Sequence, residues 1–329
     1  MRKLRFAIIL DYVFSTYQSV IRWGVERYAR QNDIQTVYFG VGSLNPNIPD
    51  AIARERLFEI IRPAEYDGLL IVSATLMQSH NQERIRDWLK TFAGLPMVAI
   101  GPAVGDEPAV LVNGKAGMRD LVLHMIRQHG YRDLAFISGP FANPESIDRL
   151  EVYKACLADN GIEFDAARVY EGNFRQASGK EAVTEFFDAR GLRPRAIVCA
   201  NDVMAIGAWK NLRARGLSIP QDIAVTGFDD LQILRMVSHQ FTTVRQPFEE
   251  QAWQAARLLH QRIRGNAADP PPPLPSELRI RTSCGCIAPD RRLRKNAPAN
   301  SAEGCALLSK RLEAHVGAGI TGLETDSLC

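Results

Sequence analysis

Short apolar segments alternate with amphipathic segments of helical length along most of this chain, and this alternation narrows the folds that it can adopt. A first series of apolar segments lies at residues 6–10, 36–39, 68–72 and 97–100, and a second series lies between residues 134 and 226. Strands that alternate with helices in this way form βαβ units with parallel sheets and right-handed crossovers. The sequence therefore predicts an α/β fold with two similar lobes, each built on a doubly wound parallel sheet.

Three of the later apolar segments end on polar side chains that could reach a bound molecule. These ends are Asn201-Asp202, Asp229-Asp230 and Arg245-Gln246. In an open parallel sheet, ligands bind beyond the carboxyl ends of the strands. We therefore expect one ligand site where the three ends meet.

The order of residues across 195–247 resembles the effector-binding core of the LacI/GalR (lactose/galactose repressor) family, which shares its fold with periplasmic sugar-binding proteins. The resemblance extends from about Arg5 to Cys286. It implies a type I periplasmic-binding-protein-like fold, in which two lobes are joined by three crossovers and a ligand cleft lies between them. The sequence departs from the family pattern at Asn113-Gly114, where the family usually has Asp-Asn.

The resemblance also implies a discontinuous division of the chain. Its three crossings are expected near Asn113, near residues 243–246 and after the proline run that begins at Pro270. The expected N-terminal lobe comprises residues 1–112 and about 246–270, and the expected C-terminal lobe comprises residues 113–245 and about 274–286. Residues 287–329, rich in Ala, Gly and Ser behind a basic run, cannot bury much apolar surface and are expected to form a poorly ordered tail or a linker stub.

Two of the strand ends carry the first candidate ligand residues. Either side chain of Asn201-Asp202 could cap the helix that follows, and we expect Asp202 to cap it while Asn201 hydrogen-bonds effector hydroxyls, as the resemblance implies. The resemblance likewise assigns Asp229 to the effector, because an ionised carboxylate can accept two hydroxyls at once. The alternative for Asp229 is a turn or a helix cap after the strand.

Two further candidates precede these strand ends. Arg149 matches an arginine of the family's cleft, where a planar guanidinium binds effector oxygens or pairs with a carboxylate, although most arginines on helices are solvated. Phe174 matches an aromatic side chain that packs on a sugar ring, with ordinary core packing as its alternative. The remaining expected ligand-binding residues, from the opposite wall, are Asp11, Tyr12, Tyr17 and Gln246.

The patterns of common enzymes and metal sites are missing from the sequence. It has no Gly-x-Ser-x-Gly elbow, HExxH pair or GxGxxG motif, and Asp229-Asp230 has no matched acid or nucleophile. Cys284-Gly-Cys286 is one residue shorter than the CxxC spacing of metal sites, and His124 and His129, five residues apart, would not share a face of an α-helix. We therefore expect no enzyme, no cofactor and no metal site.

The charge balance and the apolar pattern limit the partners and the compartment. Lys and Arg total 40 against 37 Asp and Glu, which gives no electrostatic reason to expect a nucleic acid or a membrane surface as partner. The apolar run at 6–10 stops at Asp11, short of the roughly 7–15 residues of a signal-peptide core. No run approaches the roughly 20 residues of a membrane span. A cytoplasmic protein with free thiols is expected.

The resemblance implies a non-enzymatic sensor that binds a small polar metabolite, first of all a sugar, and signals by closure of its lobes. Family repressors begin with a helix-turn-helix domain, which does not precede the first strand here, so we expect no direct DNA binding by this chain alone. The alternative output is a larger histidine kinase or diguanylate cyclase, in which similar input cores typically end in a segment like Arg281–Cys286. An enzyme is the least favoured interpretation.

A two-fold homodimer is expected, because cores of this family pair side by side. The helix at residues 118–126 carries an apolar stripe. This stripe would pack mainly on its own sheet, and Met118 and Leu121 could extend to the partner.

Overall fold

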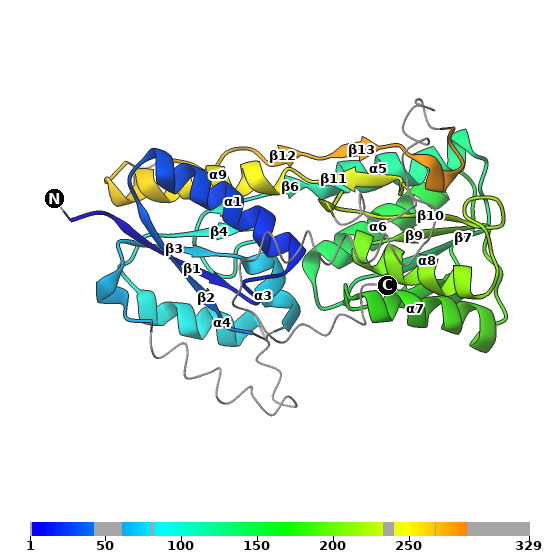
Figure 1. The fold of residues 1–329 in the computed structure, drawn as a ribbon, viewed down its shortest axis with the longest axis horizontal. Helices are drawn as coiled ribbons and strands as arrows, with labels where there is room; N and C mark the ends of the chain where they lie inside the picture. The colour runs from blue at the N-terminus through cyan, green and yellow to red at the C-terminus, as the bar shows by residue number, and fades with distance from the viewer. Residues whose placement is uncertain (1, 43–60, 80–81, 233–239, 267, 288–329) are drawn as a thin grey trace, which may run out of the picture. The chain divides into compact units, whose positions relative to one another are not determined.

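Two parallel β-sheets organise the part of the chain that the computed structural model describes (Figure 1). The described residues are 2–42, 61–79, 82–232, 240–266 and 268–287. Of the tail expected at residues 287–329, only Ile287 belongs to the described residues. None of the described helices is long and apolar enough to cross a membrane.

The first sheet has the strand order β2-β1-β3-β4-β5, and all its pairs are parallel. Its strands are β1 (Arg5–Leu10), β2 (Gln35–Gly40), β3 (Gly68–Ile71), β4 (Met97–Ile100) and β5 (Ala109–Val110). Residues 6–10 are fully buried because helices cover both faces of the central strand. Phe6, Ile8 and Leu10 pack with α1 (Thr16–Gln31) and α9 (Phe248–Ile263), whereas Ala7 and Ile9 pack with α3 (Ser73–Ser79) and α4 (Gln82–Leu89).

The second sheet has the order β10-β9-β7-β8 and is also parallel. Its strands are β7 (Leu134–Ser138), β8 (Val169–Glu171), β9 (Ala196–Cys199) and β10 (Ala224–Thr226). Its helices are α5 (Gly114–Leu123), α6 (Pro144–Ala158), α7 (Gln176–Thr184) and α8 (Asp202–Ala214). Helices α7 and α8 pack closely because Gly179 and Gly207 lie at their contact, where a Cβ atom would come within 2.0 Å of the backbone of the opposite helix.

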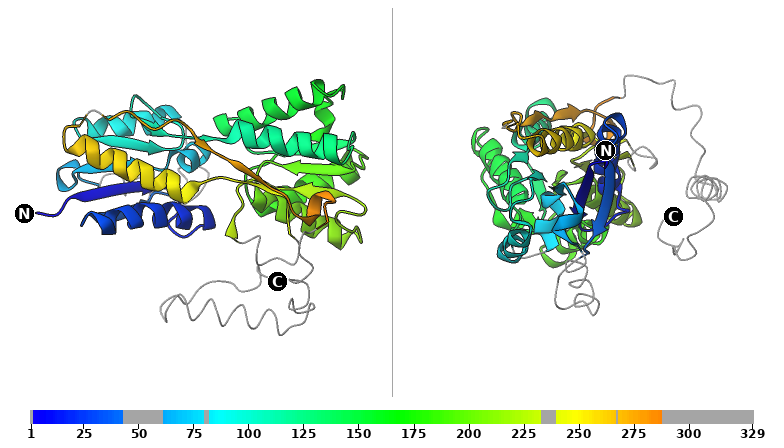
Figure 2. Two further views of the ribbon diagram at one scale, coloured as in Figure 1. Left: turned by 90° about the horizontal axis from the view of Figure 1, so that it is seen from above. Right: turned by 90° about the vertical axis from the view of Figure 1, so that its left-hand side faces the viewer.

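Three stretches of chain connect the sheets (Figure 1). The first crossing runs through β6 (Val112–Asn113) into α5, and the second runs through β11 (Thr243–Arg245) into α9, which lies against α1 and the first sheet (Figure 2). The third crossing runs through β12 (Leu274–Pro275) and β13 (Glu277–Arg279). Strand β12 pairs with β6, and β13 pairs antiparallel with β11, so the crossings support one another. The predicted fold of two doubly wound lobes with three crossovers is confirmed.

Helix α5 packs on its own sheet along its whole apolar stripe. Met118 and Leu121 are fully buried within the single chain, in a cluster with Phe136 of β7. The prediction that the stripe packs mainly on its own sheet is confirmed, and the further suggestion that Met118 and Leu121 extend to a partner is wrong, because both side chains are fully buried in this cluster.

The end of α5 departs from α-helical geometry. It continues into a π-helical turn, η3 (His124–Gln128), in which hydrogen bonds join residues five apart. His124 and His129 consequently lie on the same side, with ring centroids 4.9 Å apart. The prediction that they would not share a helix face is wrong, because it assumed the α-helical repeat.

Candidate functional site

Asn201 lies at the end of β9 and begins helix α8. Its Oδ1 accepts a hydrogen bond from the Met204 backbone N–H at 2.8 Å, and its Nδ2 donates to the Phe174 carbonyl oxygen at 3.1 Å. Asn201 is thus the N-cap of α8, and the prediction that Asp202 caps this helix is wrong. Contact between Asn201 and a ligand stays a prediction.

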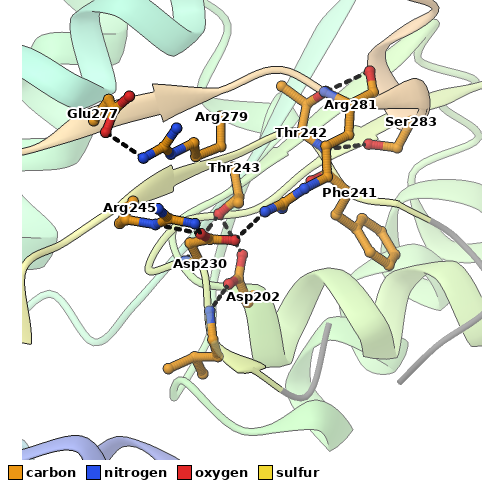
Figure 3. Close-up of polar contacts among 11 residues, drawn as sticks. Asp202, Asp230, Phe241, Thr242, Thr243, Arg245, Glu277, Arg279, Arg281 and Ser283 are labelled. Atoms are coloured by element: carbon orange, nitrogen blue, oxygen red, sulfur yellow. Dashed lines mark hydrogen bonds and ion pairs between the residues drawn. The ribbon is translucent and has the colours of Figure 1, made fainter. Parts of the chain in front are cut away.

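Asp202 instead braces the loop after β10 from inside the protein. Its side chain is fully buried, and its carboxylate accepts hydrogen bonds from the Leu231 backbone N–H at 2.8 Å and the Thr243 hydroxyl at 2.6 Å (Figure 3). Burial, together with the negative charge of Asp229, raises the pKa of this carboxyl well above its usual value. Asp202 therefore connects the start of α8 to the second crossing.

The adjacent carboxylates Asp229 and Asp230 have different partners. The Asp230 side chain is fully buried and pairs at 2.5 Å with the guanidinium groups of both Arg245 and Arg281 (Figure 3). Arg245 belongs to the second crossing, and Arg281 follows the third. Asp230 therefore fastens two crossings to the end of β10, and it is not half of a catalytic carboxylate pair.

Asp229 lies in a partly buried position at the same turn. Its backbone has a φ of 112°, and its Oδ1 accepts a hydrogen bond from Gln246 Nε2 at 2.7 Å. Burial raises the pKa of the Asp229 carboxyl to about 7, although Arg149 and the Gln246 hydrogen bond oppose this increase. A proton can therefore be gained or lost by Asp229 near neutral pH.

Arg149 points into the protein from α6, although most arginines on helices are solvated. It is 5% exposed, and it donates hydrogen bonds of 3.0 Å to the Ala200 carbonyl oxygen and to the carboxylate of Glu145. Its guanidinium carbon lies 4.4 Å from the centre of the Phe228 ring. The side chain is thus held at the carboxyl end of β9, with its positive charge near Asp229.

Phe174 occupies the same wall as Arg149. Its backbone has a left-handed φ of 61°, and its ring lies so close to Gly139 that a Cβ atom there would be 2.1 Å from the ring. The Arg149 guanidinium is 5.9 Å from the ring centre. Phe174 therefore places an apolar surface beside the arginine.

Tyr17 of α1 lies near charged side chains of both lobes. Its ring packs edge-on against Phe248 at 4.6 Å between centroids. Burial raises the pKa of the Tyr17 hydroxyl well above 10, and the negative charges of Glu145, Asp229 and Asp11 add to this increase while Arg149 opposes it. Charged groups from α6 and the β10 loop therefore lie close to a tyrosine of α1.

The remaining predicted residues of this wall differ in environment. The carboxylate of Asp11 accepts a hydrogen bond from Gln18 Nε2, and Tyr12 is 40% exposed in the loop between β1 and α1. Gln246 is buried against Asp229. Asp11, Tyr17, Arg149, Asp229 and Gln246 therefore form one electrostatic group, Asn201 and Phe174 join it from the second sheet, and Tyr12 lies at its margin.

Three residues that the sequence did not single out also belong to this region. Gln18 is fully buried, donates to Thr75 Oγ1 at 2.7 Å, and has no hydrogen-bond partner for its Oε1 among the described residues. Asn143 caps α6 and reaches the Ala74 carbonyl oxygen of the first lobe at 3.5 Å. Glu145 could have been found from its i,i+4 spacing to Arg149, and Asn143 from the helix-start pattern Asn143-Pro144. Gln18 lies at i,i+3 spacing from Ile21 on the buried face of α1, so its polar side chain on that face was a signal as well.

The two lobes are in contact on one side of this site. Leu231, which follows β10, is buried in the core cluster of the first lobe, and Val203 of α8 packs against the same cluster. A cavity of about 300 Å³ borders Asp229 and Gln246 next to this contact, at the lower limit of small-molecule sites. Arg149 lies outside that cavity.

The known proteins to which this chain is similar agree with one another in kind. Residues 123–284 match the family model described as "Periplasmic binding protein-like domain". The chain is similar to the HTH-type transcriptional regulator CelR of Thermobifida fusca, with 32% identity over 223 residues, which are 67% of this chain and 63% of CelR. It is also similar to the HTH-type transcriptional repressor PurR of Vibrio atlanticus, with 27% identity over 243 residues, which are 73% of this chain and 69% of PurR.

Solved structures agree with these relatives. The "transcriptional regulator CelR-cellobiose complex" superposes with a TM-score of 0.72 and 27% identity, over 86% of this chain and 85% of that one. The regulator CcpA of Lactococcus lactis gives a TM-score of 0.73 at 24% identity, over 86% of this chain and 99% of that one. These relatives are named as regulators, and the match spans 63% of the length of CelR, which is less than two thirds.

Proposed function

The core of this chain belongs to the LacI/GalR family, and from that premise we propose that it is a sensor module that binds a small polar molecule between its lobes. The observation that carries the proposal is the grouping of Arg149 and Asp229 from the second lobe with Tyr17 from the first. The lobe boundaries expected from the sequence and a cytoplasmic location are parts of this proposal.

The chemistry of the group favours a polyhydroxylated ligand. The Asp229 carboxylate and the Gln246 amide can accept and donate hydrogen bonds, and the guanidinium of Arg149 supplies donors in a fixed plane. Phe174 offers an apolar face beside them, which suits the C–H surface of a sugar ring. A sugar is therefore the ligand class we propose, and the cellobiose complex of a relative supports it.

Signalling in this proposal follows from a change in the populations of open and closed arrangements of the lobes. A ligand that contacts both walls binds the closed arrangement better and increases its population. Asp202 and Asp230 join the β10 loop to the second and third crossings, so a change at the site reaches the segments that connect the lobes. Because the relatives are named as transcription regulators, we propose transcription regulation as the output of the whole protein.

The proposed function is tested with a panel of sugars, polyols and purines in a thermal-shift experiment. A ligand at a hundred times its Kd should add about 2.7 kcal/mol to the free energy of unfolding. The Asp229→Asn variant, which keeps the shape of the side chain, should lose most of the stabilisation produced by the best ligand. The Arg30→Ala variant, which changes an exposed arginine of α1, serves as the control and should keep it.

Two outcomes would contradict the proposed function. The first is that no sugar, polyol or purine changes the unfolding temperature. The second is that the best ligand acts equally on the Asp229→Asn variant, the Arg30→Ala control and the unmodified chain.

A further inference from the structure

Four side chains that can bind a metal converge at one end of the second lobe. They are His124 and His129, at the π-helical end of α5, and Cys284 and Cys286, beyond the third crossing. Their four ligating atoms lie within 4.8 Å of one another. Both cysteines are free thiols, and no ligand role in the site between the lobes uses any of the four.

Four of the six separations between these atoms are close to the edges of a tetrahedral metal site, and no separation exceeds 4.8 Å. His124 Nε2 lies 3.2 Å from His129 Nε2 and 3.5 Å from Cys284 Sγ. Cys286 Sγ lies 3.6 Å from His124 Nε2 and 3.4 Å from His129 Nε2. With Zn–N near 2.0–2.1 Å and Zn–S near 2.3 Å, a tetrahedron has N–N edges of about 3.3 Å and N–S edges of about 3.5 Å.

The backbone builds this arrangement from two local irregularities. The π-helical turn places His124 and His129 on the same side of the helix end. Between the cysteines, Gly285 has a φ of 108°, and a Cβ atom there would come within 3.3 Å of the His129 ring. Glycine therefore allows two thiols separated by a single residue to face the same histidines.

Neighbouring residues hold the ligands in place. The Thr242 hydroxyl lies 3.0 Å from Cys284 Sγ, a position from which it can donate to a thiolate. The Tyr131 ring stacks on His129 at 5.6 Å between centroids, and its hydroxyl donates to the Cys284 carbonyl oxygen at 3.2 Å. Such outer contacts orient ligands and are typical of metal sites.

We propose that His124, His129, Cys284 and Cys286 bind one zinc ion in a structural site. A set of two thiolates and two imidazoles in tetrahedral positions is the ligand set that zinc prefers. All four positions are filled by protein side chains, and His124 and Cys284 are buried, so no position is left for a substrate. The expectation of no metal site, which rested on the short CxC spacing and the α-helical repeat, is replaced by this proposal.

The position of the ligands indicates what the metal does. Helix α5 follows the first crossing, and the 3₁₀ turn η7 (Thr282–Cys284) follows the third. Zinc would therefore clamp the last described segment of the core to the helix that begins the second lobe. The C-terminal end of the core would then stay attached to α5 when the lobes move.

The first test is the metal content of the full chain, purified without a metal-affinity step and measured by inductively coupled plasma mass spectrometry. About one zinc per chain is expected. After removal of zinc, Co²⁺ should restore the site and give the intense visible bands of a tetrahedral ion with thiolate charge transfer. Substoichiometric zinc after reconstitution, or the weak spectrum of an octahedral cobalt ion, would overturn the proposal.

The second test compares matched variants by zinc content and by circular dichroism. Cys286→Ser and His129→Gln should each remove most of the bound zinc and lower the unfolding temperature. Cys156→Ala removes a buried free thiol of α6 and should leave the zinc content unchanged, as should a chain with both Cys305 and Cys329 replaced by Ser. A folded Cys286→Ser protein with full zinc, or a mass that shows a Cys284–Cys286 disulfide in the freshly purified chain, would overturn the proposal.

Discussion

Adjacent side chains at the end of β10 have different environments, and these environments assign their roles. Asp230 is buried between two guanidinium groups and holds the crossings together, whereas Asp229 has one amide donor and a pKa near neutral. The strand-end pattern predicted a ligand site at Asp229-Asp230, and only the resemblance favoured Asp229 over Asp230 as the residue that contacts the ligand. The partners of Asp230 could not be predicted, because Arg245 and Arg281 become its neighbours only when two crossings lie side by side.

The raised pKa of Asp229 predicts a specific dependence of stability on pH. A folded-state pKa of about 7 against an ordinary value of 3.8 means that the folded chain favours the protonated carboxyl. The resulting contribution to the free energy of unfolding is complete below pH 3.8 and is lost as the pH rises to about 7, by about 1.4 kcal/mol for each pH unit between these values. Thermal unfolding from about pH 5 to about pH 8 should therefore show the unmodified chain losing stability relative to the Asp229→Asn variant. Parallel curves for the two proteins would show that Asp229 titrates normally.

At the scale of elements, periodicity predicted the order of strands and helices, because buried parallel strands and amphipathic helices are local patterns. Two errors concern the ends of helices, and their causes differ. The π-helical turn at 124–128 replaces the α-helical repeat, and Asn201 rather than Asp202 caps α8 because the Asp202 carboxylate is used by Leu231 and Thr243. Neither can be derived from spacing, since the first is a change of helix type and the second depends on contacts distant in sequence.

The contacts of Asp230 predict that it is the main fastening between the crossings and the second sheet. Replacement by Asn leaves two guanidinium groups without their carboxylate, and Arg245 and Arg281 are 37% and 20% exposed. We therefore expect the free energy of unfolding to fall by about 2–3 kcal/mol, which is less than the ~3–5 kcal/mol expected when a fully buried ion pair is broken. Urea unfolding measures it, and Asp148→Asn, in an exposed pair with Lys115, should lose less than about 1 kcal/mol. Equal losses of unfolding free energy in the two variants would show that Asp230 is not the main fastening between the crossings and the second sheet.

At the scale of the whole molecule, the site is assembled from two lobes that are far apart in sequence. Tyr17 and Asp11 come from the first lobe, and Arg149 and Asp229 come from the second. The division into lobes was predictable from two series of strands. The contacts of Leu231 and Asn143 across the lobes were not, because they depend on how the lobes pack.

Pairing of two chains stays the prediction for assembly, because the resemblance is to a family whose cores pair side by side. Because Met118 and Leu121 are buried in their own lobe, the partner surface must use other residues. Multi-angle light scattering at micromolar concentration should give about twice the chain mass of 36.6 kDa. A mass equal to that of one chain, unchanged on addition of ligand, would exclude the dimer.

The structure of the chain with the ligand that stabilises it most tests the central claim most directly. The account predicts that the ligand lies between the lobes, with its hydroxyl groups within hydrogen-bond distance of Asp229 and Arg149 and its apolar face toward Phe174. A larger cavity in the described part of the chain, about 1040 Å³ and lined by Arg86, Lys90 and Arg262 of the first lobe, should be free of it. A ligand bound in that cavity, with Arg149 and Asp229 unchanged, would contradict the account.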